Sequence, residues 1–412
     1  QEALARIAGF TYMSDALRLL TVNAIDQGEK PSVPGAITKY HTTELGRKAA
    51  SDAMDIHGGK GIMLGPNNYL ARSYQSIPIA ITVEGANILT RSMIIFGQGA
   101  IRCHPYILKE MEAVQQDDIK TFDKLLMQHA GYLLRNKLRA LFHGLTGSRF
   151  AHAPTHSIEA KYYRQWARAS AAFALIADCT MILLGGKLKF KESLSARLGD
   201  CLSMMYIGSA VLKTYADHGK PIEEFPLVEW SSEWCLQKFW TSVDEIFTNY
   251  PNRWLGFALR AVVMPFGLRA KGPKDTLNKK VSKILTTENI ARINLVDKIF
   301  ISEKETDQIH ILDLAFKETL NVLPIRKRLL EAVKSKAIES GPIEHAIEAA
   351  VKAKILTAEE ATKLSYAESL CKKIIAVDDF DPKTLASFAP QTPPTQQNTA
   401  KVTVRTINQS KD

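Results

Sequence analysis

The stretch "GAITKYHTTELGRKAASDAMDIHGGKG" (residues 35–61) combines a helical pattern with an abrupt glycine-rich end. Apolar residues recur at helical spacing over residues 36–57, from Ile37 to Ile56, which predicts an amphipathic α-helix. Adjacent glycines then break the pattern, because glycine favours turns over helix interiors. We therefore expect a helix that leads directly into a glycine-rich loop over residues 57–68.

The same helical pattern continues on both sides of this stretch. Apolar residues recur at helical spacing over residues 1–27, 84–100 and most of 106–385, with glycine or proline breaks between the runs. Alternation typical of strands is rare, so we predict an all-α fold. Residues 388–412 are rich in proline, threonine and glutamine, and we expect a disordered tail there.

Composition and charge exclude several classes of protein. Of the 412 residues, 46% are hydrophobic and 23% charged, as in a typical globular protein. The five cysteines lie far apart without a CxxC pair, which fits free thiols in a reducing compartment. The histidines form no metal-binding motif either, so we expect no metal. The net charge of +10 comes without a nucleic-acid-binding signature, so we expect no nucleic-acid partner.

Two stretches raise the question of a membrane. Residues 169–186 are strongly apolar, but Asp178 interrupts them, and no stretch reaches the ~20 uninterrupted apolar residues of a membrane span. We expect a buried core helix there. Residues 253–274 combine aromatic residues with arginines and lysines, which is typical of a helix on a membrane surface. A partly buried helix with a basic rim is the alternative.

The stretch "ITVEGANILTR" (81–91) places a single carboxylate, Glu84, in an apolar run. If the apolar neighbours bury it, desolvation disfavours its charged form, and such a carboxylate can act as a general base. The alternative is a glutamate in the first turn of a helix that begins near residue 85, where the helix dipole favours negative charge. The local pattern by itself favours this alternative.

The stretch "DIHGGKG" (55–61) also has two interpretations. Adjacent glycines let the backbone approach a ligand closely, and backbone N–H groups in such a turn can bind phosphate. It is neither a Rossmann motif nor a P-loop, since no strand precedes it and no GK[ST] is present. By itself the stretch favours a simple turn between helices.

The order of these pieces resembles the C-terminal helical domain of the acyl-CoA dehydrogenases. In that family a helix ends in Q-x-x-G-G-x-G, a variable loop with an arginine follows, and Y-E-G-T precedes a helix with a second arginine. Here "DIHGGKG", Arg72, "VEGAN" (83–87) and Arg91 stand in similar places, and "ALARIAGFTYMSDALRLL" (3–20) resembles the preceding helix. The resemblance covers residues 1–105.

Residues 106–387 resemble the long helical extension of the FadE-type enzymes of bacterial fatty-acid β-oxidation. The stretches that carry this likeness are residues 184–215 and 253–267. The resemblance implies three parts: a C-terminal dehydrogenase bundle over 1–105, incomplete at its start, the extension over 106–387, and the tail over 388–412. We expect a fragment that lacks the N-terminal and middle domains and is inactive alone.

The resemblance implies an FAD-dependent enzyme that converts medium- or long-chain fatty acyl-CoA to trans-2-enoyl-CoA. Glu84 resembles the catalytic base, and Gly85 would leave room for the substrate. The residues implied to contact FAD are Asp55, Ile56, His57, Gly58, Gly59, Ala86 and Asn87. Asp55 stands where the family has glutamine, which puts a shorter acidic side chain near the pyrophosphate. Ala86 stands where the family has threonine, so a hydroxyl that would bond the flavin is lost, and Asn87 would supply a polar contact instead.

The resemblance also implies partners and a location. These are an electron-transfer flavoprotein, a second copy of the chain in a homodimer, and the cytoplasm with peripheral contact to the inner membrane. The alternative function is a non-catalytic helical scaffold, or a membrane-docking protein, that keeps a degenerate dehydrogenase domain. The pair Glu84–Gly85 argues against this alternative, since a scaffold has no need of a base at that position.

Overall fold

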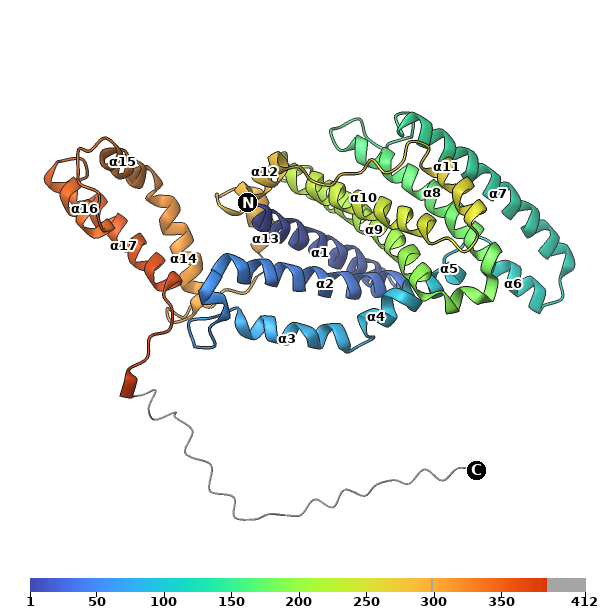
Figure 1. Ribbon diagram of the computed structural model, residues 1–412, viewed down its shortest axis with the longest axis horizontal. Helices are drawn as coiled ribbons and strands as arrows, with labels where there is room; N and C mark the ends of the chain where they lie inside the picture. Colours follow the sequence, from blue (N-terminus) through green and yellow to red (C-terminus); the bar gives the residue numbers. More distant parts are fainter. Residues whose placement is uncertain (298, 384–412) are drawn as a thin grey trace, which may run out of the picture.

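The computed structural model describes residues 1–297 and 299–383, so the predicted tail 388–412 lies outside the described residues. Within the described part all regular secondary structure is helical, which confirms the predicted all-α fold (Figure 1). The N-terminal part contains α1 (Glu2–Asp26), α2 (Ser32–His57), the 3₁₀ helix η1 (Gly58–Ile62), α3 (Ala71–Thr82), α4 (Asn87–Leu89), the π-helix η2 (Thr90–Gln98) and α5 (Gly99–Arg102). The middle part contains α6 (Ile107–Gln115), α7 (Ile119–Thr146), α8 (Ala160–Leu184), the 3₁₀ helix η3 (Gly185–Phe190), α9 (Glu192–Asp217), α10 (Phe225–Thr248), α11 (Arg253–Val263), α12 (Asp275–Leu285) and α13 (Ile290–Val296). The C-terminal part contains α14 (Gln308–Asn321), α15 (Leu323–Lys334), α16 (Ile343–Lys352) and α17 (Ala358–Ile375).

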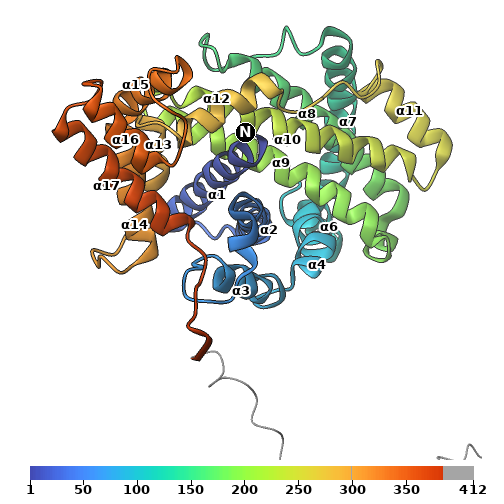
Figure 2. The ribbon, with the colours of Figure 1, turned by 60° about the vertical axis from the view of Figure 1, so that its left-hand side comes forward.

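Two separate apolar cores hold these helices together. Figures 1 and 2 show the two corresponding groups of helices, α14 to α17 and the rest of the body. The larger core joins α1, α2, η2, α8, α9, α10 and α12, with α1 packed along both α2 and α9. The smaller core lies within the part formed by α14 to α17, which stands beside the main body. The N-terminal and middle parts therefore share one core, while the last four helices pack on their own.

Two glycines let tryptophan rings pack directly on helix backbones in the larger core. A Cβ at Gly9 of α1 would lie 2.1 Å from Trp230 of α10, and one at Gly208 of α9 would lie 2.2 Å from Trp166 of α8. Phe10 adds an edge-on contact to Trp230, with 5.7 Å between the ring centroids. The close packing of α1 on α10 therefore depends on glycine at position 9.

Buried polar contacts also connect the N-terminal and middle parts. The carboxylate of Glu224 is fully buried and accepts hydrogen bonds from Tyr12 Oη at 2.5 Å and Asn294 Nδ2 at 3.1 Å. Desolvation and this carboxylate raise the pKa of Tyr12, so its hydroxyl stays a donor. On the other side of the body, Arg91 of η2 donates to both carboxylate oxygens of Asp200 on α9, at 2.9 and 2.6 Å.

The structure corrects several boundaries predicted from the sequence. The helix predicted over 84–100 begins at Asn87 and contains a π-helix. The predicted loop 57–68 begins with the short helix η1, and α3, which was not predicted, follows it with Pro78 inside. In residues 253–274 only the first half is helical, because α11 ends at Val263 and Pro265 follows.

Helix α8 contains the apolar stretch that Asp178 interrupts. The stretch Ala160–Phe190 is long and apolar enough to cross a bilayer, and 44% of its most apolar window is buried in the protein. The segments Ala71–Thr82 and Asn87–Arg102 meet at a bend of 49° and are long and apolar enough to cross a bilayer only when taken together. Because α8 packs against α7 and α9 and Asp178 is 1% exposed, it has the position expected of a core helix.

Candidate functional site

The turn between α3 and α4, residues 83–86, carries the carboxylate singled out in the sequence. Glu84 has φ = 55° and Gly85 has φ = 88°, so two consecutive residues lie in the left-handed region. Glycine adopts this conformation freely, but glutamate does so at an energetic cost. Strained residues of this kind cluster at functional sites. Five other described non-glycine residues also have positive φ, and two of them, Ser148 and Lys220, follow a glycine with positive φ. The conformation of Glu84 by itself therefore marks a tight turn.

Helix α2 holds this turn from one side. Lys39 Nζ donates to the carbonyl oxygen of Gly85 at 2.6 Å and to Asn87 Oδ1 at 2.8 Å. Asn87 Nδ2 in turn donates to Thr43 Oγ1 at 2.9 Å and to Glu44 Oε1 at 3.0 Å. The amide of Asn87, predicted to contact FAD, is therefore used within the protein as a brace. In the sequence the nearest cation to Glu84 is Arg91, but the fold brings Lys39 to the adjacent residue.

The surroundings of Glu84 differ from both sequence interpretations. Glu84 is exposed rather than buried, and it precedes the first helical residue, Asn87, by three positions, so it is not in the first turn of the helix. Its apolar neighbours are exposed too, with Val83 at 48%, Ile88 at 79% and Leu89 at 45%. The structure thus places a carboxylate on an open apolar surface, where an apolar molecule or another protein surface can cover it.

The glycine-rich loop follows the last turn of α2 and presents an open backbone. Asp55, Ile56, Gly58 and Gly59 are exposed, and a Cβ at either glycine would meet no atom within 4 Å. Gly58 has φ = 57°, a conformation that favours glycine. The space over these glycines can therefore receive a ligand at van der Waals distance from the backbone.

Side chains on the inner side of this loop fix its shape. Asn68 Nδ2 donates to the carbonyl oxygens of Gly61 at 2.8 Å and Met63 at 2.6 Å, and Asn68 Oδ1 accepts from the backbone of Leu70 and Ala71. The ring of His57 is held between the Ala53 carbonyl, 2.8 Å from Nδ1, and the hydroxyl of Tyr69. The imidazole of His57 is thus engaged inside the protein.

The turn and the loop lie at separate places along α2. His57 is 18 positions after Lys39, which corresponds to a rise of about 27 Å along the helix axis. Figure 1 shows α3 running back along α2 from the loop to the turn. A ligand group that touches Glu84 therefore does not reach Gly58, and the two elements serve different ends of a long ligand or different ligands.

The remaining predicted site residues have distinct surroundings. The guanidinium of Arg91 is paired with Asp200 of the middle part, whereas Arg72 is exposed on α3. Two hollows flank α2: one of about 680 Å³ beside α1 and residues 294–299, and one of about 510 Å³ beside α1 and α3. Glu84 lines neither of them, so it faces open surface rather than either hollow.

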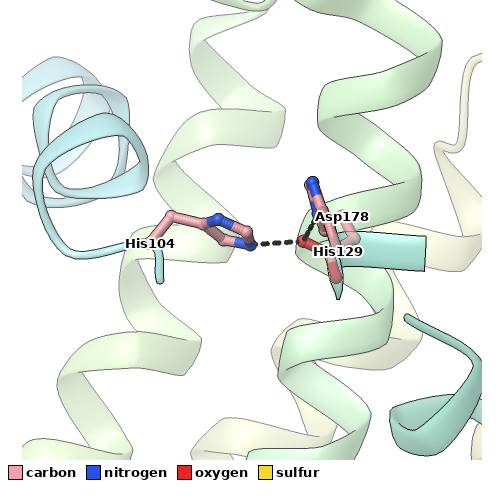
Figure 3. A group of neighbouring side chains, drawn as sticks. All are labelled: His104, His129 and Asp178. Carbon is pink, nitrogen blue, oxygen red and sulfur yellow. Dashed lines mark hydrogen bonds and ion pairs between the residues drawn. The ribbon is translucent and has the colours of Figure 1, made fainter. Parts of the chain in front are cut away.

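A group of titratable residues that the sequence analysis did not bring together lies beside α8 (Figure 3). His104 Nε2 lies 2.7 Å and His129 Nε2 3.7 Å from Oδ1 of Asp178, while Asp178 Oδ2 has no hydrogen-bond partner among the described residues. His129 Nδ1 lies 2.9 Å from Glu110. The only local signal in the sequence was Asp178 within an apolar stretch, since the other residues come from distant segments.

The hydrogen bonds of His104 indicate a structural role for this group. The backbone N–H groups of Tyr106 and Ile107 both donate to its Nδ1, at 3.2 Å. Nε2 therefore carries the proton and donates to Asp178. A metal ligand needs a free lone pair on that nitrogen. We interpret the group as structural: His104, in the turn before α6, bonds Asp178 of α8, and Glu110 of α6 bonds His129 of α7. His129 Nε2 is buried and has no hydrogen-bond partner among the described residues.

Comparisons with known proteins cover nearly the whole described chain. The family model for the acyl-CoA dehydrogenase C-terminal domain matches residues 1–97, and the model for the bacterial-type acyl-CoA dehydrogenase C-terminal region matches residues 101–380. The very long-chain specific acyl-CoA dehydrogenase of mouse mitochondria is 33% identical over 95 residues, which are 23% of this chain and 14% of that protein.

A solved structure has a similar fold. The acyl-CoA dehydrogenase complexed with FAD from Bacillus anthracis aligns with a TM-score of 0.51 and 16% identity, over 72% of this chain and 48% of that one. At this identity the likeness concerns the fold alone. The match thus spans less than half the length of either relative.

Proposed function

The chain belongs to the acyl-CoA dehydrogenase family, and we propose that it supplies the catalytic base of an enzyme that oxidises fatty acyl-CoA to trans-2-enoyl-CoA. The observation that carries this proposal is the turn 83–86. Glu84 lies there in a strained left-handed conformation, exposed to an incoming molecule, while Lys39 and Asn87 hold the following residues from behind. A carboxylate on a turn that is held by hydrogen bonds suits proton abstraction, which depends on orientation.

In the proposed reaction the carboxylate of Glu84 takes the α-proton of the acyl chain. The electron pair of that C–H bond forms the new α,β double bond as hydride leaves the β-carbon. FAD, when bound, supplies the hydride acceptor. The backbone N–H of Glu84 donates to the thioester carbonyl oxygen, where negative charge develops as the proton leaves. Gly85 keeps the neighbouring space free of a side chain.

The apolar surface around Glu84 supports a lipid substrate. Val83, Ile88 and Leu89 are all exposed beside the acid. An acyl chain that covers them removes water from the carboxylate, and a carboxylate without water accepts a proton more readily. We propose a medium- or long-chain acyl group on this ground, since a short chain would leave most of the surface wet.

The residues of the glycine-rich loop fit a dinucleotide. The open space over Gly58 and Gly59 lets a pyrophosphate approach the backbone, whose N–H groups can bind anions. We propose that this loop holds the phosphate end of FAD, with Asp55, Ile56 and His57 beside it. Asp55 is acidic and exposed, so it would face the ribose or solvent rather than the phosphates.

The separation of the loop from Glu84 supports a homodimer. If the flavin ring lies beside Glu84, its phosphates cannot rest on Gly58 of the same chain, because about 27 Å of α2 lies between the two elements. A second copy of the chain would bring its own loop to the phosphates. We also propose an electron-transfer flavoprotein as the electron acceptor.

The exposed face of α11 supports peripheral contact with a membrane. Trp254 is 85% and Phe257 71% exposed, and Arg253 lies at the start of the same helix. Aromatic and basic residues together suit an anionic lipid surface. Sedimentation with anionic vesicles tests this, because the double variant Trp254→Ser, Phe257→Ser should bind less. Unchanged sedimentation of that variant would remove the role from α11.

The main test uses the full-length protein and palmitoyl-CoA. The bound flavin should lose its visible absorbance when substrate is added, and Glu84→Gln should slow this bleaching by about 10²-fold or more with little loss of flavin. Glu29→Gln, an exposed residue between α1 and α2, is the matched control and should bleach normally. Bound flavin that never bleaches would instead favour the non-catalytic scaffold, and normal bleaching in Glu84→Gln would refute the assignment of the base.

A further inference from the structure

The segment at the C-terminal end of α17, residues 374–378, lies against the glycine-rich loop; we call it the strap. We propose that the strap positions this loop for its ligand, with Asp378 as the main positioning residue. The inference rests on the proposed function, in which the loop binds the phosphate end of FAD. In Figure 1 the red segment that follows α17 passes the end of α2, where the loop lies.

Polar contacts join the strap to both ends of the loop. Asp378 Oδ1 accepts from the backbone N–H of Asn67 at 2.9 Å, and Asn67 Nδ2 donates to the carbonyl oxygen of Val377 at 3.4 Å. At the other end, Lys60 Nζ donates to the carbonyl oxygen of Ile374. These residues are more than 300 positions apart in the chain, so the contacts close a very long loop.

Lys60 is an unusual element of this interface because its side chain is turned inward. It is 6% exposed and lies over the ring of Tyr69, 5.7 Å from the centroid. Burial lowers the pKa of its ammonium. A buried ammonium needs acceptors, and the strap carbonyl supplies one. The strap thus helps to hold Lys60 inside, so that the exposed side of the loop keeps its glycines uncovered.

Gly65 adapts the loop to Asp378. A Cβ at position 65 would lie 2.0 Å from Oδ2, 2.3 Å from Cγ and 2.9 Å from Oδ1 of Asp378. All three of the nearest atoms therefore belong to that one carboxylate. Gly65 is not among the residues with positive φ, so alanine is compatible with its backbone conformation. The close approach of the carboxylate is thus the reason that this position excludes a side chain.

Through the strap, the part formed by α14 to α17 can affect the order of the glycine-rich loop. That part has its own core in α14 to α17, and the strap leaves directly from its last helix. When α17 is in place the strap is anchored, and the loop between η1 and α3 has contacts on both sides: Asn68 from within and Asp378 from the strap. If the strap contacts are lost, the loop keeps only its hydrogen bonds with Asn68.

The test combines two measurements on the full-length protein. Hydrogen exchange of residues 58–68 without FAD reports the order of the loop, and flavin titration of the apoprotein reports the affinity for FAD. Asp378→Ala should speed exchange in the loop and weaken FAD binding about fivefold or more, as expected for loss of a charge-assisted hydrogen bond. Asp379→Ala, the exposed neighbouring acid, is the matched control and should change neither.

A double-mutant cycle separates the strap from general damage. Gly65→Ala alone should displace the strap and reproduce the effect of Asp378→Ala. In the Asp378→Ala background the same change should add little, because the clashing atoms are gone. Additive effects would overturn the assignment. If Asp378→Ala unfolds the protein, Asp378→Asn, which keeps the oxygen acceptor, should restore the loop.

The outcomes also distinguish the strap from the proposed function. Unchanged hydrogen exchange of residues 58–68 in Asp378→Ala overturns the positioning role, whether or not the affinity for FAD changes. Faster exchange with unchanged FAD affinity overturns the link between the strap and the cofactor. If the wild-type protein binds no FAD at all, the proposed function fails, while the exchange data still decide whether the strap orders the loop.

Discussion

The contact of Lys39 with the turn 83–86 leads to a direct test of how the base is held. Lys39→Met removes two charge-assisted hydrogen bonds, to Gly85 O and Asn87 Oδ1, while keeping most of the side chain's length. Such bonds contribute about 1.5–3 kcal/mol each when buried, and less where solvent screens them. The contact with Gly85 is exposed, so we expect a combined loss of roughly 1–2 kcal/mol in the free energy that holds the turn in place.

If Glu84 must be oriented for proton abstraction, that loss appears in the chemical step. A loss of 1–2 kcal/mol corresponds to a decrease of about 5- to 30-fold in the rate of flavin bleaching by palmitoyl-CoA. Flavin content should stay close to normal, because the proposed site for the phosphate end of FAD, the glycine-rich loop, lies about 27 Å away along α2 and keeps its contacts. Stopped-flow absorbance measures the rate directly.

A control and a refuting outcome complete this prediction. Lys30→Met, at an exposed position just before α2, should bleach at the normal rate. Hydrogen exchange at residues 83–87 should increase in Lys39→Met and not in Lys30→Met. A normal bleaching rate in Lys39→Met, together with faster exchange, would show that the order of the turn does not limit proton transfer.

Three further predictions concern stability and metal binding. Burial lowers the pKa of His41 to about 3, so below pH 6.5 the unfolded chain binds a proton that the folded chain does not. The free energy of unfolding should therefore fall as the pH drops from 6.5 towards 3, by up to about 1.4 kcal/mol per pH unit. Denaturant titrations at pH 7 and 5 should show this loss in the wild type and a smaller loss in His41→Phe. Gly9→Ala should cost about 1–3 kcal/mol through its clash with Trp230, whereas Gly35→Ala, where a Cβ meets nothing within 4 Å, should be neutral or slightly stabilising; thermal melts that rank the two variants equally would contradict the packing argument. Added Co²⁺ should give no tetrahedral absorption bands, because His104 donates its Nε2 proton to the carboxylate of Asp178 and so has no free lone pair on that nitrogen. Bands that appear in the wild type and disappear in Asp178→Asn would instead indicate a metal site.

Much of the fold could be predicted from local pattern. The run from Ile37 to Ile56 predicted α2, which spans Ser32–His57, because a helix buries one face and repeats its apolar residues accordingly. The apolar stretch around Asp178 predicted a core helix for the same reason. Pattern was less informative where short or irregular helices occur. Helix α3 contains Pro78, and an internal proline argues against a helix when the sequence alone is read. The π-helix η2 follows from backbone hydrogen bonds that side-chain periodicity does not encode.

The candidate site divides differently between sequence and structure. The motifs at 55–61 and 83–87 were identified in the sequence through their order along the chain, which resembles that of the family. The surroundings of Glu84 could not be predicted from the sequence, since the exposure of its side chain depends on whether neighbouring elements cover the turn. Lys39 escaped notice because it is 45 positions from Glu84 in the chain, and only the packing of the turn on α2 brings it to Gly85.

The sequence by itself determined the helical class, the family and the two motifs, because periodicity and motif order are local or nearly local properties. Only the tertiary structure decided that the two motifs lie about 27 Å apart along α2, one at its end and one beside Lys39. It also decided that Arg91 pairs with Asp200 and that the carboxylate of Asp378 packs against Gly65. The physical reason is that hydrogen bonds and ion pairs between distant segments depend on how whole helices pack. No short window of sequence contains that information.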